Sequence, residues 1–316
     1  MSLTPRVSII IPVFNGSNFL RQTIDSILSN TNSALCELIV IDDGSKDETS
    51  QICASFGAKI RYEYQINQGE FAATNRGFDI AEGDFIMIVS HDDPMLSPNL
   101  IPRAIEILDQ HLELACVYPD WQIINSEGEV IAKKIVQEYS EDELIGRFNC
   151  LPGPGAVFRK KLARDIGGRR NWKYGSDYDF WLRLSRLGEF KRIPGVYAQW
   201  RSHGKSTTVS MKGFDMASER IAIMKNFVTE NTINPKLARV ALSSAYYYAA
   251  RLGVFSKKIP AKKWLIISFL KRRNWPEVAN PLVVLFTLTL PLSSFLLNLL
   301  VPYSKKLQRI SHSLTN

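Results

Sequence analysis

The chain is poor in the residues that metal and hydrolase motifs require. Its four cysteines are widely spaced, and none has the paired spacing of a zinc site or redox dithiol, so we interpret them as reduced core residues. Four histidines leave little material for a Ser-His-Asp hydrolase, and neither a GxSxG elbow nor a GxGxxG motif is present. Gly204-Lys205-Ser206 resembles the end of a phosphate-binding P-loop, but Gln199 stands where that loop requires its first glycine.

The N-terminus lacks a basic segment followed by an apolar one, so we expect no secretory signal peptide and a cytoplasmic body. The net charge of +8 is unevenly distributed. Residues 1–212 carry 24 lysines and arginines against 27 aspartates and glutamates, whereas residues 213–316 carry 15 against 4. This C-terminal basic excess surrounds an apolar segment, which indicates a membrane surface rather than nucleic acid as the partner.

Strands and helices alternate over the first 120 residues. The run Val7–Val13 is apolar and β-branched, as in a strand buried on both faces, and helical spacing follows it. Further strand-helix units follow at 38–56 and 60–81, and a fourth strand at 85–89. This pattern predicts an α/β fold with a Rossmann-like, doubly wound, mostly parallel sheet. Ligands bind at the carboxyl ends of such strands, where polar residues occur: Asn15, Asp42, Asp43, Asn67, Asp92 and Asp93.

Beyond residue 114 the pattern is looser. We expect strands near 115–118 and 196–200, a helix over 176–187, and helices over 214–273.

The turn after the second strand contains a candidate base-binding residue. Asp43 could accept the imide N–H of a uracil or a comparable base edge, and Gly44 would let the backbone approach closely. The structural alternative is a helix start, because Ser45 and Glu48 have the spacing of a capping box.

Two adjacent carboxylates, Asp92 and Asp93, follow the fourth strand. They repel each other, and a bound Mg²⁺ or Mn²⁺ would remove that repulsion while also binding a substrate diphosphate. The alternative is an ordinary solvated turn before Pro94.

A third acidic candidate lies at the start of the helix predicted from Ser176. Asp177 falls in its first turn, where backbone N–H groups and the helix dipole favour the ionised carboxylate, which could take a proton from a hydroxyl nucleophile. The alternative is an N-capping aspartate.

Together these segments resemble the family 2 glycosyltransferases, which have the GT-A fold. The resemblance covers roughly residues 5–210 and rests on seven segments in the family's order: VSIIIPVFN, IVIDDGSKDET, NQGEFAATNRGFDIAEGDFI, IVSHDDP, GPGAVFRKKLARDIGG, SDYDFWLRL and AQWRSH. It implies an inverting enzyme of the hexosyltransferase type that depends on Mn²⁺ or Mg²⁺. Such an enzyme would move a sugar from a nucleoside-diphosphate sugar, with a UDP-sugar favoured, to a glycan or lipid-linked acceptor hydroxyl.

The resemblance also implies residue roles. It assigns nucleotide-sugar binding to Pro12, Phe14, Asn15, Asp43, Arg76, Asp92 and Arg201. It assigns metal binding to Asp93, Asp92 and His203, with a structural role as the alternative for His203. Asp177 matches the general base of the family.

Two departures from the family pattern bear on these roles. Ser90 and Ser176 stand where the family often has acidic residues, so the metal would depend on Asp93 with Asp92, and Asp179 competes with Asp177 as base. We prefer Asp177, because Asp179 points elsewhere on a helix.

The Q-x-x-R-W element of processive synthases is missing, which favours addition of one sugar. A catalytically silent nucleotide-sugar-binding or scaffold protein is the alternative.

We expect a catalytic domain over 1–212, with a nucleotide-sugar half over about 1–120 and an acceptor half over about 121–212. Residues 213–316 form the predicted helical, basic C-terminal region. Residues 278–304 carry no charge, are long enough to cross about 30 Å of hydrocarbon, and are divided by three prolines. Basic flanks on both sides favour a re-entrant or interfacial hairpin over one span or soluble packing. This places the protein at the cytoplasmic face of the membrane, peripheral or monotopic.

Overall fold

The computed structural model describes residues 4–32, 34–95, 97–203, 213–253 and 261–272. The chain divides into two compact units, one of Met1–Met211 with Asn226–Thr232 and one of Lys212–Lys225 with Ile233–Asn316, and each is described by itself. The apolar segment 278–304 lies outside the described residues. Among the helices that are described, none has the length and hydropathy needed to span a bilayer.

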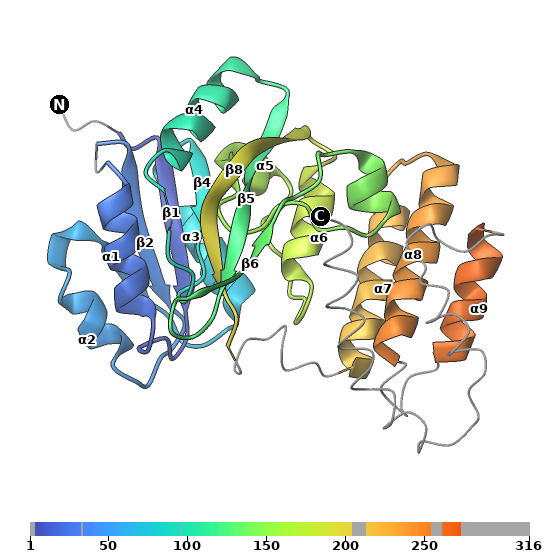
Figure 1. The fold of residues 1–316 in the computed structure, drawn as a ribbon, viewed down its shortest axis with the longest axis horizontal. Helices are drawn as coiled ribbons and strands as arrows, with labels where there is room; N and C mark the ends of the chain where they lie inside the picture. Colours follow the sequence, from blue (N-terminus) through green and yellow to red (C-terminus); the bar gives the residue numbers. More distant parts are fainter. Residues whose placement is uncertain (1–3, 33, 96, 204–212, 254–260, 273–316) are drawn as a thin grey trace. The chain divides into compact units, whose positions relative to one another are not determined.

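The first unit is built on a mixed sheet, in which the described residues form eight strands in the order β3-β2-β1-β4-β7-β5-β6, with β8 paired to β5 (Figure 1). The strands are β1 (Val7–Val13), β2 (Cys36–Asp42), β3 (Arg61–Tyr64), β4 (Phe85–Ile88), β5 (Leu114–Ile124), β6 (Val130–Lys134), β7 (Val157–Arg159) and β8 (Glu189–Arg201). The helices are α1 (Leu20–Asn30), α2 (Thr49–Ala54), α3 (Glu70–Ile80), α4 (Leu100–Gln110), α5 (Lys160–Asp165) and α6 (Ser176–Leu184).

Strand β1 is buried along its whole length because helices cover both of its faces. The side chains of Val7, Ile9, Ile11 and Val13 belong to the core cluster that also contains the apolar faces of α1 and α4. On the other face, Ile10 contacts Gly77 of α3 so closely that a Cβ atom at Gly77 would lie 2.5 Å from it. Burial on two sides explains why the strand is apolar rather than alternating.

The register of the parallel strands brings their polar ends together. Val13 of β1 is paired with Asp42 of β2, and the Asp43 amide donates to the Val13 carbonyl at 2.8 Å. On the other side of β1, Ile10 is paired with Ile88 of β4, which leaves the turn at 90–93 beyond the same edge. The predicted parallel units and their common edge are therefore confirmed.

The second half of the sheet differs from the pattern expected from the sequence. Strand β7 pairs antiparallel with both β4 and β5, and so joins the parallel half to the remainder. Strand β8 begins at Glu189 rather than near 196 and runs parallel to β5 as far as Arg201. Helix α4 and strands β6 and β7 were not expected from the sequence.

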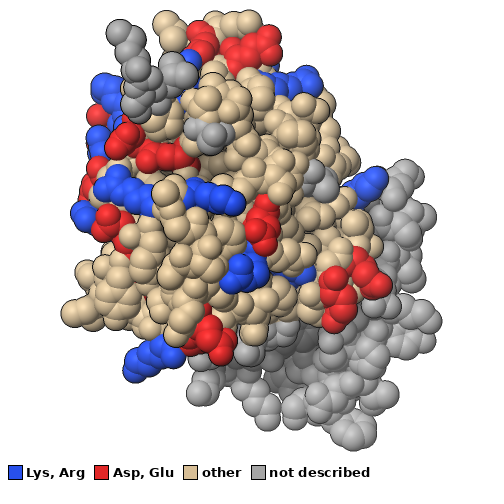
Figure 2. Space-filling model, turned by 90° about the vertical axis from the view of Figure 1, so that its left-hand side faces the viewer, with Lys and Arg blue, Asp and Glu red and all other residues tan. Residues whose placement is uncertain are grey.

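The face of the molecule shown in Figure 2 has interspersed acidic and basic side chains. This matches the nearly balanced charge of residues 1–212. The basic excess of the chain lies in residues 213–316, which carry 15 lysines and arginines against 4 aspartates and glutamates.

The second unit is helical where it is described, as predicted. It contains the first part of α7 (Gly213–Glu230), together with α8 (Pro235–Gly253) and α9 (Ala261–Arg272). Small residues let α8 and α9 approach closely: the Ser243 hydroxyl donates to the Ser268 carbonyl and the Ser268 hydroxyl to the Ser243 carbonyl, each at 2.8 Å. Apolar residues around them, including Tyr247 and Leu265, form a separate buried cluster.

Candidate active site

A cavity of about 770 Å³ opens at the carboxyl ends of β1 and β4. A volume of this size suits a nucleotide-sugar, since ligand pockets are typically about 300–1,000 Å³. Seven of the residues singled out from the sequence lie on its wall: Pro12, Phe14, Asp43, Asp92, Asp93, Asp177 and His203. These residues come from five separate stretches of chain. Of the six polar residues expected at the strand ends, Asp43, Asp92 and Asp93 line the cavity, whereas Asn15, Asp42 and Asn67 do not belong to its wall.

Asp43 is buried, and hydrogen bonds from the loop before α3 hold its carboxylate. Oδ1 accepts from Gln65 Nε2 at 2.7 Å and from the Gln68 amide at 2.9 Å, and Oδ2 accepts from the Gly69 amide at 2.8 Å. An ionised carboxylate offers about four acceptor positions, so Asp43 retains capacity for one further donor in the cavity.

The capping box expected next to Asp43 does not form. The Ser45 hydroxyl instead accepts a hydrogen bond from the Asn15 amide at 2.9 Å, and Asp47 accepts from the amide and hydroxyl of Thr49 at the start of α2. Helix α2 begins one residue after Glu48, too late for the predicted spacing.

Asn15 was expected to bind the nucleotide-sugar, but it does not belong to the cavity wall. Its side-chain oxygen accepts from the Lys46 amide at 2.8 Å, and its backbone has a φ of 51°. Asparagine tolerates this left-handed conformation better than most residues. Asn15 therefore joins the turn after β1 to the turn after β2, while Pro12 and Phe14 face the cavity.

Asp92 is held in its ionised form by its neighbours. Burial alone would raise its pKa, but His91, the Ser90 hydroxyl and His203 outweigh burial and lower it. His203 Nε2 lies 2.7 Å from Asp92 Oδ2, and Ser90 Oγ donates to Asp92 Oδ1.

Asp93 has the opposite character. Burial and the adjacent charge of Asp92 raise its pKa well above the ordinary value, although its Oδ1 accepts from the Arg201 amide at 2.7 Å. Burial and the neighbouring negative charge both oppose ionisation of Asp93, and a nearby cation would offset both effects.

The three residues predicted to bind the metal, Asp92, Asp93 and His203, do not form a metal-binding group by themselves. Within the described residues there is no group of three or more His, Cys, Asp or Glu side chains that could hold a metal ion. Mg²⁺ in proteins usually binds through one or two carboxylates together with waters and substrate phosphates, rather than in a cage made of protein side chains alone.

Arg201 was expected to bind the nucleotide-sugar, but its guanidinium is buried away from the cavity wall. It donates to the Asp92 carbonyl at 2.9 Å, to Gln22 at 2.7 Å, and to the carbonyls of Asn125 and Ser126. The ring of Phe19 lies 4.6 Å from it. Its donors are committed to these groups, so Arg201 positions the acidic turn.

Arg76 likewise lies outside the cavity wall, in contrast to its expected place near the nucleotide. It is on α3, where Glu70 and Ala73 face the cavity instead. The Arg76 guanidinium is half-exposed and lies 3.5 Å from the Glu63 carboxylate.

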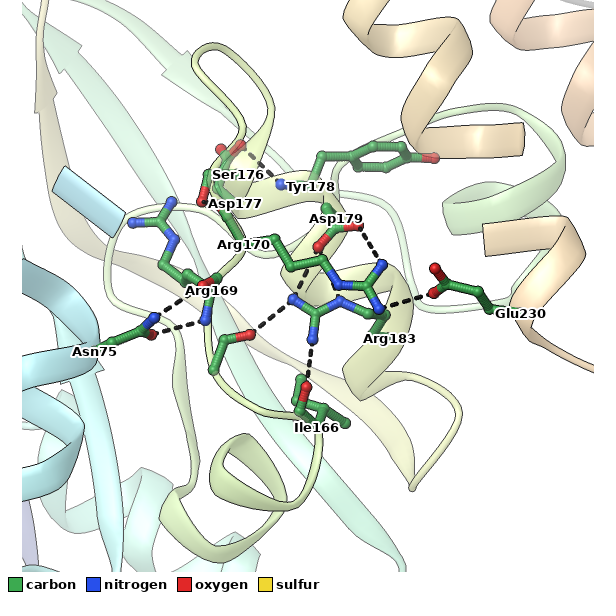
Figure 3. Close-up of polar contacts among 11 residues, drawn as sticks. Asn75, Ile166, Arg169, Arg170, Ser176, Asp177, Tyr178, Asp179, Arg183 and Glu230 are labelled. Carbon is green, nitrogen blue, oxygen red and sulfur yellow. Dashed lines mark hydrogen bonds and ion pairs between the residues drawn. The ribbon is translucent and has the colours of Figure 1, made fainter. Parts of the chain in front are cut away.

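Asp177 and Asp179 on α6 have different environments (Figure 3). Asp177 lies on the cavity wall, and its Oδ1 accepts from the Tyr178 amide at 2.7 Å. Asp179 is buried and pairs with Arg183 at 2.8 Å. The structure therefore places Asp177, and not Asp179, where a substrate hydroxyl could reach it.

Several cavity residues were not anticipated from the sequence, including Glu70, His91, Trp121, Arg169 and Trp200. The two tryptophans contact edge to face, with ring centroids 6.0 Å apart, and come from adjacent strands β5 and β8. Their pairing depends on a parallel register between strands about 80 residues apart, which no local pattern in the sequence reveals.

Comparison with known proteins agrees with this arrangement. The family described as "Glycosyl transferase family 2" matches residues 8–167. An uncharacterized glycosyltransferase of Rickettsia typhi is 32% identical over 267 residues, covering 81% of each chain. A chondroitin synthase of Escherichia coli is 30% identical over 77% of this chain, which corresponds to 34% of the length of that protein.

Two solved structures share the fold. S. aureus TarS 1–349 in complex with UDP-GlcNAc aligns with a TM-score of 0.66 at 16% identity, covering 84% of this chain and 79% of that one. A mannosyltransferase from Pyrobaculum calidifontis in complex with GDP-Man and Mn²⁺ aligns with a TM-score of 0.54 at 14% identity, covering 85% and 87%. The match over residues 8–167 and the Rickettsia relative together show that this chain belongs to glycosyltransferase family 2.

Proposed function

We propose that this chain is an inverting glycosyltransferase that moves one sugar from a nucleoside-diphosphate sugar to an acceptor hydroxyl. The observation that carries the proposal is that one cavity is lined by Asp43, the pair Asp92 and Asp93, and Asp177. A base-binding carboxylate, a cation-binding pair and a proton acceptor are the groups that this reaction requires.

Asp177 would act as the general base. A hydroxyl is a poor nucleophile, and a carboxylate that removes its proton during attack contributes roughly 10²- to 10⁴-fold in rate. Attack from the face opposite the leaving nucleotide inverts the anomeric carbon. The environment of Asp177 supports this role, because it lies on the cavity wall while Asp179 is committed to Arg183.

Asp92 and Asp93, with His203, would hold Mn²⁺ or Mg²⁺. The cation would offset the charge that develops on the leaving diphosphate. The buried pair of carboxylates with its raised Asp93 pKa supports this assignment, as does the Mn²⁺ in the structure of the mannosyltransferase that shares the fold. The UDP-GlcNAc in the TarS structure supports a UDP-sugar as donor.

The acceptor is proposed to be a glycan or a lipid-linked glycan in surface polysaccharide or glycolipid assembly. The relative named chondroitin synthase supports a polysaccharide product. The edge-to-face pair Trp121 and Trp200 on the cavity wall supports an acceptor with sugar rings, since amphipathic aromatic surfaces suit such rings.

Attachment to the cytoplasmic face of the membrane is proposed from the sequence of residues 278–304 and the basic residues around it. Deletion of residues 275–316, followed by cell fractionation, tests it. We expect the full chain in the membrane fraction and the shortened chain in the soluble fraction; a full chain that is soluble without detergent contradicts the proposal.

Activity is tested by first screening UDP-, GDP- and dTDP-sugars with Mn²⁺ for thermal stabilisation, because a bound ligand raises the melting temperature by mass action. Turnover of the stabilising donor is then compared in the wild type, Asp177→Asn and Asp165→Asn. Asp165 is a matched control on α5, paired with Lys161 on the surface.

We expect a loss of roughly 10²-fold or more in Asp177→Asn and none in Asp165→Asn. Unchanged turnover in Asp177→Asn removes Asp177 from the base role. A donor that binds but is never turned over by the wild type favours the second candidate, a catalytically silent nucleotide-sugar-binding protein.

A further inference from the structure

Three arginines of the described residues are buried in the first unit, and they differ in how their guanidinium donors are used. These are Arg169, Arg183 and Arg201. Arg183 donates through Nε, Nη1 and Nη2 to Asp179, the Ile166 carbonyl and the Gly168 carbonyl. Arg201 also uses all three of its nitrogens. Arg183 and Arg201 therefore each have a hydrogen-bond partner at all three guanidinium nitrogens.

Arg169 does not follow this pattern. Its side-chain contacts among the described residues use Nη1, which donates to Glu70 Oε1 at 2.7 Å and reaches Thr74 Oγ1 at 3.5 Å. Its Nε atom is buried without a hydrogen-bond partner. An unsatisfied buried donor carries a free-energy penalty that folded proteins rarely accept without a functional reason.

Hydrogen bonds nevertheless fix the backbone of Arg169 in place (Figure 3). The Asn75 side chain donates to the Arg169 carbonyl and accepts from the Arg169 amide, both at 2.8 Å. The preceding residue, Gly168, has a φ of +69°, and a Cβ atom there would lie 2.4 Å from Asn75 Oδ1. Its carbonyl accepts from Arg183. These contacts fix the backbone of Arg169 between α3 and α6.

Arg169 lies on the wall of the same cavity as Asp177, and its side chain is 8% exposed. Its ion-pair partner Glu70 has a side chain that is 68% exposed and is the first residue of α3. Solvent screens an exposed carboxylate, so this partner holds Arg169 weakly. The guanidinium fork formed by Nε and Nη2 matches the two oxygens of a carboxylate or phosphate.

We propose that Arg169 binds an anionic oxygen pair of the bound nucleotide-sugar, which takes the place of Glu70. Release of the Glu70 contact lets the side chain turn Nε and Nη2 toward the cavity. The inference rests on the proposed function, because the anion is part of the donor. Two parts of a donor have this chemistry: the diphosphate, and a carboxylate on the sugar.

The test measures binding by calorimetry, in the presence of Mn²⁺, of uridine, UDP, UDP-glucose and UDP-glucuronic acid. The variants of the full chain are Arg169→Gln, Arg169→Lys and the control Arg103→Gln, which alters an exposed arginine on α4. We expect Arg169→Gln to bind UDP roughly tenfold more weakly, with uridine affinity unchanged, if the diphosphate is the anion. If the sugar carboxylate is the anion, UDP-glucuronic acid alone loses affinity.

Equal binding of all four probes by the wild type and a folded Arg169→Gln variant overturns the inference. Failure of the wild type to bind any nucleotide, GDP and dTDP included, contradicts the proposed function instead, so the two failures are distinguishable. Arg169→Lys should recover part of the affinity, because it keeps the charge but not the fork.

Glu70→Gln provides a test that survives if the Arg169 variants do not fold. A competing carboxylate is removed, so we expect the affinity for the same anionic probe to rise by roughly threefold or more. If the Arg169–Glu70 pair has only a structural role, Glu70→Gln should lower the melting temperature without any gain in affinity, and that result overturns the inference.

Discussion

Asp179 Oδ2 lies 2.8 Å from Arg183 Nη2, in a buried ion pair on the same helix that presents Asp177 to the cavity. Arg183 also donates to the carbonyls of Ile166 and Gly168, so the pair connects α6 to the loop before it. Two aspartates two residues apart thus have separate tasks, one in holding the loop and one at the cavity.

This separation predicts that Asp179→Asn lowers stability. Removal of the carboxylate leaves the Arg183 charge buried without its partner, at a cost of about 3–5 kcal/mol in the free energy of unfolding. Urea denaturation of the wild type, Asp179→Asn and Asp177→Asn measures it. We expect Asp177→Asn to unfold near the wild-type midpoint; equal losses in the two variants would contradict the division of tasks.

A second prediction concerns Arg201 and the acidic turn. In Arg201→Gln the hydrogen bonds to the Asp92, Asn125 and Ser126 carbonyls are lost, which we expect to lower the free energy of unfolding by about 3 kcal/mol. Because these bonds position the Asp92 turn, Mn²⁺ affinity should fall as well. Titration of Mn²⁺ into UDP-bound protein checks this, with Arg103→Gln as the control. A folded variant with unaltered Mn²⁺ affinity would show that the turn holds its shape without Arg201.

A third prediction is that Arg76 makes no contact with the nucleotide. Since its half-exposed side chain lies off the cavity wall, Arg76→Gln should change the free energy of unfolding by no more than about 0.5 kcal/mol. UDP affinity, measured by calorimetry, should stay the same. A clear loss of affinity would restore Arg76 to the nucleotide site.

A fourth prediction uses two glycines with positive φ. Gly44 has a φ of +83°, and a Cβ atom there would lie 2.9 Å from the Asn67 amide nitrogen, whereas Gly57 has a φ of +54° and open space around it. Each alanine variant should lower the free energy of unfolding by about 1–3 kcal/mol, because alanine adopts a positive φ only with backbone strain. Only Gly44→Ala should additionally displace the turn at Asp43 and weaken UDP binding. Equal effects of both variants on UDP affinity would exclude the contact as the cause.

The parallel half of the sheet was predictable because its strands are buried on both faces and therefore have unbroken apolar runs. Strand β1 has the bounds expected of it. Strand β7 was not predictable from the sequence, since three residues are too few to show a periodic pattern of apolar residues. The early start of β8 was hidden by polar residues and by Pro194 and Gly195 within it.

The site residues differ in the same way, because some could be placed from the sequence and others could not. Residues in the turns that follow a strand, such as Asp43 and Asp92, lie where topology places them. Arg201 and Arg169 could not be placed from sequence, because their surroundings depend on distant partners: Gln22 and Asn125 for Arg201, Asn75 and Glu70 for Arg169. Whether an arginine is saturated by carbonyl groups or left with a free donor depends on tertiary contacts alone.

The three hydrogen bonds that Asp43 accepts from the loop before α3 bear on how donor preference could change during evolution. A nucleotide base that meets Asp43 shares it with Gln65, Gln68 and Gly69, so the direction of the remaining lone pair depends on that loop. A shift from one base to another would then require no substitution at Asp43. Comparison of relatives with different donors should find the variation at positions 65–69.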